Sequence, residues 1–238
     1  MIKTILFDLD GTLLPLDESR FILLYFGGIV KRFSSLGYDG KKLIQAIMES
    51  TDATIANDGS SLNVDCFWKR FGELFPSDQI KLDKEFQQFY QNDFPMVQNA
   101  STFQPLASKI VKQLKAKGYR LAIATNPVFP AVATRQRIAW AGLDITDFEL
   151  VTTFENSHFC KPNLKYYQEV LKTIGALPNE TMMIGNDAWE DMIAGELGMD
   201  CYLVTDCLIN RQNHDVSSYR HGTFHDLMNF IKTFPDLR

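Results

Sequence analysis

The chain has 238 residues and a formal net charge of −5, with 45% hydrophobic and 22% charged residues. This composition is ordinary for a globular protein, and the length suits one large domain or a main domain with a smaller insert. It contains no basic run of the kind that binds nucleic acid, no stretch near the roughly 20 apolar residues of a membrane span, and no zinc-type spacing among its four cysteines. We therefore expect a cytoplasmic protein with free thiols, no nucleic-acid partner and no membrane partner.

The first predicted element is a short buried strand. Residues 4–9 are mostly apolar and are interrupted by Asp10 and Gly11. A short apolar run that ends at a glycine is typical of a strand inside a parallel sheet.

Residues 17–93 have a different pattern. Apolar and aromatic residues recur there at helical spacing in four groups that turn residues separate. The pattern predicts four helices without a strand, packed as a small helical domain at residues 15–98.

Strands and helices alternate in the remainder. Strands are predicted at 120–125, 148–152, 181–184 and 201–204, and helices at 105–118, 130–141, 162–174, 188–198 and 224–232. This alternation predicts an α/β fold, a doubly wound parallel sheet of Rossmann type. Its core would consist of residues 1–14 and 99–238, with the all-helical domain inserted after the first strand.

Polar side chains follow four of the predicted strands at the edge where such sheets bind ligands. They are Asp8 and Asp10 after the first strand, Thr125 and Asn126 after the second, Lys161 in the loop after the third, and Asn186, Asp187 and Asp191 after the fourth. Each has an ordinary structural interpretation as a turn, a helix cap or a solvated side chain. Their joint occurrence at four strand ends favours a phosphate and metal site.

Asp8 and Asp10 are the candidate catalytic pair. Two carboxylates this close repel each other, and a hard cation such as Mg²⁺ relieves the repulsion. Asp8 could then attack phosphorus and form an aspartyl-phosphate. Asp10 is placed to protonate the leaving alcohol and then to take a proton from water.

The other candidates complete this site. Thr125, Asn126 and Lys161 are expected to bind phosphate, Lys161 through its positive charge. The expected metal ligands are Asp8 and Asp10, joined by Asp187 or Asn186.

The motifs resemble those of the haloacid dehalogenase (HAD) superfamily of hydrolases. The segment from Phe7 to Leu13 is similar to its first motif, Thr125-Asn126 to the second, Lys161-Pro162 to the third, and the segment from Gly185 to Asp191 to the fourth. The resemblance implies that residues 15–98 are a helical cap, that the backbone carbonyl of Asp10 is a metal ligand, and that Thr12 and Asp191 support the site.

One position departs from the family pattern. The fourth motif commonly has Asp directly after its glycine, whereas here Asn186 follows Gly185 and Asp187 comes next. Asp187 is favoured as the ligand because a carboxylate binds Mg²⁺ more strongly than an amide.

The resemblance implies a magnesium-dependent phosphatase that hydrolyses a small phosphorylated metabolite. Asp10 favours phosphate-ester hydrolysis, because the family's dehalogenases lack this second Asp. Two alternatives remain, a sugar phosphomutase of the same superfamily and a non-catalytic phosphate-binding or regulatory protein. No feature of the sequence indicates the oligomeric state.

Overall fold

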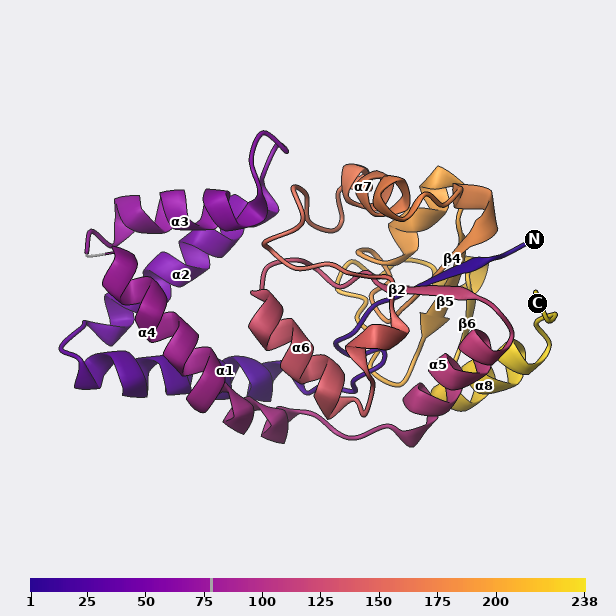
Figure 1. The fold of residues 1–238 in the computed structure, drawn as a ribbon, viewed down its shortest axis with the longest axis horizontal. Helices are drawn as coiled ribbons and strands as arrows, with labels where there is room; N and C mark the ends of the chain where they lie inside the picture. The colour runs from indigo at the N-terminus through magenta and orange to yellow at the C-terminus, as the bar shows by residue number, and fades with distance from the viewer. Residues whose placement is uncertain (78) are drawn as a thin grey trace.

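The computed structural model describes residues 1–77 and 79–238, and this part of the chain contains one six-stranded parallel sheet (Figure 1). The strand order is β3-β2-β1-β4-β5-β6. The strands are β1 (Thr4–Phe7), β2 (Arg120–Ile123), β3 (Leu150–Val151), β4 (Thr181–Gly185), β5 (Asp200–Val204) and β6 (Arg220–Gly222). The chain adds β2 and β3 on one side of β1 and then returns to place β4 on the other side. The order therefore reverses between β1 and β4, where open α/β sheets bind ligands.

Helices cover both faces of the sheet. They are α5 (Pro105–Ala116), α6 (Ala131–Trp140), α7 (Leu164–Ile174) and α8 (Phe224–Lys232). Ile5 and Phe7 point to one face and pack in the cluster that includes α5 and α8, while Leu6 points to the other and packs with α7. Because both faces of β1 are covered, Ile5, Leu6 and Phe7 are all apolar. The expected doubly wound α/β fold is confirmed.

The cap lies beside the core in Figure 1 and contains α1 (Glu18–Ser35), α2 (Gly40–Ile55), α3 (Asn63–Leu74) and α4 (Gln79–Asn92), followed by the 3₁₀ helix η1 (Phe94–Ala100). Within the described residues of this segment there is no strand, in agreement with the periodicity. Phe33, Phe71 and Phe89 are fully buried in its aromatic centre. This cluster consists mainly of cap residues and extends to Ala133 of α6, so it also packs the cap against the core.

Two adjacent linkers join the cap to the core. The N–H of Asp17 donates to the carbonyl of Ala100, and the N–H of Thr102 donates to that of Pro15, both at 2.9 Å. Further contact comes from α6, whose Trp140 stacks on Phe94 of η1 with ring centroids 5.3 Å apart.

The start of α3 also contacts the core. The fully buried side chain of Asn63 donates to the carbonyls of Pro127 and Phe159, at 3.3 and 3.4 Å. The cap is therefore bonded to the two loops that carry Asn126 and Lys161.

Several predicted boundaries were wrong. β1 ends at Phe7 rather than Leu9, because the chain turns at once, with the N–H of Leu14 donating to the carbonyl of Leu9 at 2.8 Å. The predicted strand 148–152 contracts to the two residues of β3. The predicted helix 162–174 begins only at Leu164, since the Asn163 side chain caps it by accepting from the N–H of Lys165.

Two further elements differ from the prediction, one in its type of helix and one because no strand was expected there. The predicted helix 188–198 is a 3₁₀ helix, η4 (Met192–Leu197), preceded by turns in which the Asp191 side chain bonds back to the N–H of Asp187. The edge strand β6 was not predicted, because Arg220 and His221 are exposed and the segment contains no apolar run.

Among the described residues, no helix combines the length and the apolar composition that crossing a bilayer requires.

Candidate active site

Lys161 lies between two carboxylates at the C-terminal edge of the sheet. Its Nζ atom is 2.9 Å from Oδ1 of Asp8, which follows β1, and 2.6 Å from Oδ1 of Asp191, which follows β4. All three side chains are nearly or fully buried. Such a buried group of charges is stable only because each charge has a partner.

Burial and charge change the proton affinities of this group. Burial raises the pKa of Asp8 to about 7, despite the opposing effect of Lys161, and Asp191 adds to the rise by repulsion. Burial alone would lower the pKa of Lys161, but Asp191 and Asp8 outweigh it and hold that pKa well above its usual value. Lys161 therefore stays a cation beside the candidate nucleophile.

Asp10 is paired with an arginine that the sequence analysis missed. Arg137 of α6 is 2% exposed, and its Nη1 atom forms an ion pair with Oδ2 of Asp10. Burial raises the pKa of Asp10, although Arg137 opposes the rise. A carboxyl group whose pKa is raised holds a proton closer to neutral pH, which suits a general acid.

Thr12 joins the first and fourth motifs. Its hydroxyl lies 3.2 Å from Oδ2 of Asp8 and 2.9 Å from Oδ1 of Asn186. The Asn186 amide also donates to the carbonyl of Cys207 at 2.7 Å. Gly11 has a φ of 84°, and a Cβ there would lie 2.3 Å from Nδ2 of Asn186. Glycine is thus required both by the turn and by the packing of Asn186.

The side chain of Asp187 caps the turn that follows it. Its Oδ1 accepts hydrogen bonds from the N–H groups of Trp189 and Glu190, each at 2.8 Å, as a capping carboxylate does. Asn186, in contrast, is 2% exposed and directs an oxygen toward Thr12 beside Asp8. The choice between the two as metal ligand stays a prediction, and these hydrogen bonds favour Asn186.

The loop after β2 is held by buried hydrogen bonds. The carbonyl of Thr125 accepts from the hydroxyls of Thr152 and Tyr166, at 2.6 and 2.9 Å. The Asn126 side chain accepts from the N–H of Lys161 at 3.2 Å and donates to Glu190 at 3.1 Å. The Asn126 amide thus positions Lys161 and Glu190. The phosphate contact predicted for Asn126 would then be made by its backbone and not by its side chain.

A small polar pocket of about 140 Å³ brings most of these groups together. Its walls include Asp8, Asp10, Thr125, Asn126, Arg137, Asn186, Asp187, Glu190 and Asp191. The predicted candidates from three strand ends therefore share one cavity. Lys161 lies behind the wall, since it is 1% exposed and contacts Asp8 and Asp191.

The donor chemistry of this pocket fits a hard cation such as Mg²⁺. Among the described residues, no three His, Cys, Asp or Glu side chains form a ready cluster of metal ligands, so amide and backbone oxygens would have to take part. Oδ1 of Asp10 is buried without a hydrogen-bond partner. The carboxylates of Asp8, Asp10, Glu190 and Asp191 outnumber the two cations Lys161 and Arg137. Oxygen atoms with surplus negative charge are what Mg²⁺ prefers.

Two residues of this pocket escaped the sequence analysis. Arg137 falls between Ala133 and Ala141, and such a spacing puts an arginine on the buried face of its helix. Glu190 precedes Asp191, and burial raises its pKa to about 7. The sequence feature that could have identified Arg137 is a single charged residue on the apolar face of a predicted helix.

Comparison with known proteins agrees with the geometry. The sequence model of the haloacid dehalogenase-like hydrolase family matches residues 2–197. The chain belongs to this family. The expected resemblance is confirmed, as is the expectation of a hydrolase of the phosphatase type.

Curated relatives of this family member include two kinds of phosphatase. The pyrophosphatase PpaX of Bacillus mycoides is 26% identical over 198 residues, which are 82% of this chain and 79% of that protein. The glyceraldehyde 3-phosphate phosphatase of Methanothermobacter thermautotrophicus is 29% identical over 113 residues. The match spans 47% of this chain and about half of that relative, 49%.

Solved structures share the fold. A HAD phosphatase from Thermococcus onnurineus has a TM-score of 0.63 at 22% identity, with 99% of this chain and all of that chain covered. An L-2-haloacid dehalogenase from Xanthobacter autotrophicus has a TM-score of 0.59 at 14% identity, covering 98% of this chain and all of that one. At these identities the likeness shows the fold alone.

Proposed function

We propose that this HAD-like hydrolase is a cytoplasmic, magnesium-dependent phosphatase that cleaves a phosphate monoester through an aspartyl-phosphate on Asp8. The observation that supports it most is the position of the Asp8 carboxylate, in a polar pocket beside Asp10 and 2.9 Å from the Lys161 ammonium. The metal would be held by Asp8, the backbone carbonyl of Asp10 and Asn186 or Asp187. When bound, it would offset the repulsion between carboxylates and phosphate.

In the first step an Asp8 carboxylate oxygen attacks phosphorus and the bond from phosphorus to the ester oxygen breaks. The leaving alkoxide takes the proton that Asp10 holds. Lys161 offsets part of the negative charge on Asp8 and on the transferred phosphoryl group. Asp191 and the Asn126 side chain keep Lys161 in place.

In the second step water attacks the phosphorus of the aspartyl-phosphate. Asp10, now a carboxylate, accepts the proton of that water. The bond from phosphorus to Asp8 breaks, which releases inorganic phosphate and restores both carboxyl groups. Arg137 keeps Asp10 oriented through both steps.

The experiment is phosphate release from p-nitrophenyl phosphate by wild type and by Asp8→Asn, with magnesium and after chelation with EDTA. We expect the wild type to turn over only with the metal, and hydroxylamine to trap an acyl-phosphate on it. The variant should fold and lose activity, because an amide is not a nucleophile toward phosphorus. Retention of more than about one hundredth of the wild-type rate would contradict the covalent role.

A phosphomutase would convert a sugar phosphate into its isomer without net release of phosphate. Product analysis with glucose 1-phosphate separates this alternative from hydrolysis. A non-catalytic phosphate-binding protein would release phosphate from neither substrate.

A further inference from the structure

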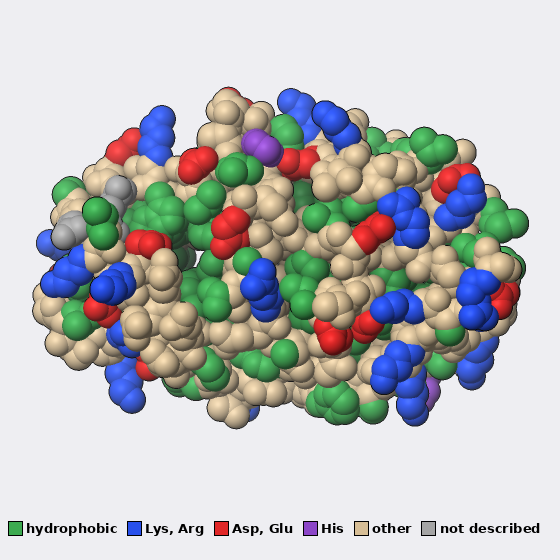
Figure 2. All heavy atoms as spheres, in the orientation of Figure 1, with side chains coloured by type: hydrophobic (Ala, Val, Ile, Leu, Met, Phe, Trp, Pro, Cys, Tyr) green, Lys and Arg blue, Asp and Glu red, His purple; other side chains and the backbone are tan. Residues whose placement is uncertain are grey.

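A large cavity lies between the cap and the core, next to the small polar pocket. Its volume is about 900 Å³. Cavities that bind drug-sized ligands measure about 300–1,000 Å³. Figure 2 shows hydrophobic side chains beside the hollow between the cap helices and the core. The space is much larger than a phosphate group needs.

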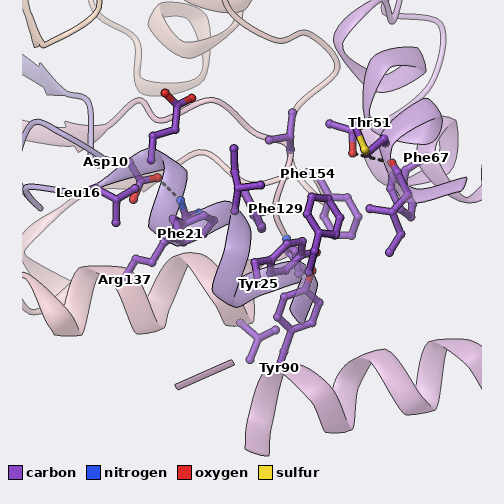
Figure 3. Close-up of a pocket in the computed structure, with 18 of the residues that line it drawn as sticks. Asp10, Leu16, Phe21, Tyr25, Thr51, Phe67, Tyr90, Phe129, Arg137 and Phe154 are labelled. Atoms are coloured by element: carbon purple, nitrogen blue, oxygen red, sulfur yellow. Dashed lines mark hydrogen bonds and ion pairs between the residues drawn. The ribbon is translucent and has the colours of Figure 1, made fainter. Parts of the chain in front are cut away.

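Aromatic rings from both parts of the chain line this cavity (Figure 3). Tyr25 of α1 meets Phe129 of the core edge to face, with ring centroids 5.4 Å apart. Phe67 of α3 meets Phe154 of the core in the same way at 6.2 Å. Such walls bind apolar and aromatic groups by excluding water and through ring contacts.

The large cavity opens into the catalytic pocket. Asp10, Phe129, Arg137 and Asn186 line both. A phosphate held beside Asp8 would therefore direct its ester oxygen past Asp10 and its organic group toward the aromatic rings. The leaving group is the part of the substrate that the large cavity must accept.

The charge around the cavity is negative. Four exposed carboxylates border it, those of Glu18, Asp52, Asp83 and Glu155, and of these Glu18 is paired with Arg211 outside the lining. Among the described residues that line it, Arg137 is the single Lys or Arg, and its charge is already paired with Asp10. A leaving group with a carboxylate or a second phosphate would find no free cation there and would be repelled.

We propose that the substrate of this chain is a phosphate monoester whose alcohol is bulky, apolar or aromatic, and free of negative charge. This inference rests on the proposed phosphatase function. A substrate of this class differs from the two that appear in the names of the relatives. The leaving group of pyrophosphate is an anion, and the leaving group of glyceraldehyde 3-phosphate has three carbons.

The first test compares two pairs of esters with magnesium present, by phosphate release. 4-Phenylbutyl phosphate and ethyl phosphate differ in apolar size, while benzyl phosphate and 4-carboxybenzyl phosphate differ in one negative charge. We expect kcat/KM to be at least about tenfold higher for the first member of each pair, since burial of a phenyl group and avoidance of like charge each contribute that much.

The second test alters the wall. Met48 of α2 lines the cavity and is 54% exposed, so Met48→Arg should fold and should place a cation in the wall. We expect the preference for benzyl over 4-carboxybenzyl phosphate to fall by about tenfold. Ile55→Arg is the matched control, because Ile55 lies on the same helix, is 41% exposed and is absent from the lining. It should leave the preference unchanged.

A third measurement does not depend on turnover. Calorimetry should detect binding of the free alcohol 4-phenylbutan-1-ol to the wild type, and weaker binding to Met48→Arg. Equal rates within both ester pairs, or no binding of the alcohol, would overturn the inferred substrate class while the phosphatase function stands. Binding of the alcohol without phosphate release from any ester, p-nitrophenyl phosphate included, would contradict the phosphatase function and support the apolar site.

Discussion

Asp191 holds Lys161 in the candidate active site, with its Oδ1 atom 2.6 Å from the Lys161 Nζ atom and with the two side chains 2% and 1% exposed. Lys161 keeps a second contact with Asp8 at 2.9 Å. Because a buried ammonium needs a charged partner, Asp191 can supply that partner while Asp8 is engaged with substrate.

Asp191→Asn should reduce kcat about 10- to 100-fold, because an amide holds the Lys161 ammonium less firmly. The KM for p-nitrophenyl phosphate should change less, since Asp191 acts through Lys161. Steady-state kinetics at fixed magnesium measure both. Asp200→Asn, which removes an exposed carboxylate from β5, is the control. A variant with lower thermal stability and an unchanged kcat would show that Asp191 is only structural.

Gly185→Ala should displace Asp191. A Cβ at this position would lie 2.1 Å from Oδ2 of Asp191, so either the strand or the carboxylate must move. We expect a loss of about 1–3 kcal/mol in the free energy of unfolding, measured by urea titration, together with a fall in kcat. Gly195→Ala is the matched control, because its nearest neighbour, the Cys201 sulfur, would be at an ordinary 3.6 Å. Equal behaviour of the two variants would refute the packing argument.

Magnesium activation curves should identify the metal ligand of the fourth motif. Asn186→Ala should raise the magnesium concentration for half-maximal activity more than Asp187→Ala does, because Asn186 is directed toward Thr12 and Asp187 caps the next turn. Asn186→Asp should lower that concentration, since a carboxylate binds Mg²⁺ more strongly. Asp187→Ala should instead cost about 1 kcal/mol of stability through the lost cap. A larger shift for Asp187→Ala would restore the preference drawn from sequence.

Arg137→Met should slow hydrolysis of the aspartyl-phosphate more than its formation. Without the arginine, the pKa of Asp10 should rise further, because burial would act unopposed by that cation. Asp10 would keep its proton and accept one from water less readily, at a cost of about tenfold or more in the second step. Rapid mixing with p-nitrophenyl phosphate should then show a burst of nitrophenolate. An unchanged steady-state rate without a burst would exclude this role.

The stability of the metal-free protein should depend on pH through Asp8. Burial, partly opposed by Lys161, raises its pKa from 3.8 to about 7, so the folded chain binds the proton more tightly than the unfolded chain does. The stability of wild type relative to Asp8→Asn should be greatest below pH 4 and decrease up to about pH 7. The slope is at most about 1.4 kcal/mol per pH unit.

Urea unfolding of both proteins in EDTA at several pH values measures this difference. Added magnesium should flatten the profile, because a metal ion at Asp8 favours the carboxylate. A difference that is constant with pH, or that increases as the pH rises, would contradict the raised pKa.

Most strands and helices of the α/β core could be predicted from the local pattern of apolar residues. The apolar run before Asp8 and the regular alternation that follows Pro105 are enough to indicate strands, helices and a parallel sheet, because burial imposes periodicity on the chain. The same pattern located Asp8, Lys161 and Asp191, since parallel strands end at one edge of the sheet. It missed β6, whose exposed Arg220 and His221 carry no periodic signal.

The tertiary structure decided the partners of these residues. Arg137 meets Asp10 across 127 positions of the chain, and Thr12 meets Asn186 across 174. Neither pairing has a local signature, because the first depends on how α6 packs against the sheet and the second on the pairing of β1 with β4.

The sequence by itself therefore determined the family, five of the six strands and the candidate residues for phosphate chemistry. Only the tertiary structure decided that Asp187 caps a turn and that Asp10 has an arginine partner. It alone also decided that rings from α1, α3 and the core enclose one apolar cavity. The physical reason is that periodicity and turn chemistry are read from neighbouring residues, whereas a cavity is made by surfaces that meet only after folding.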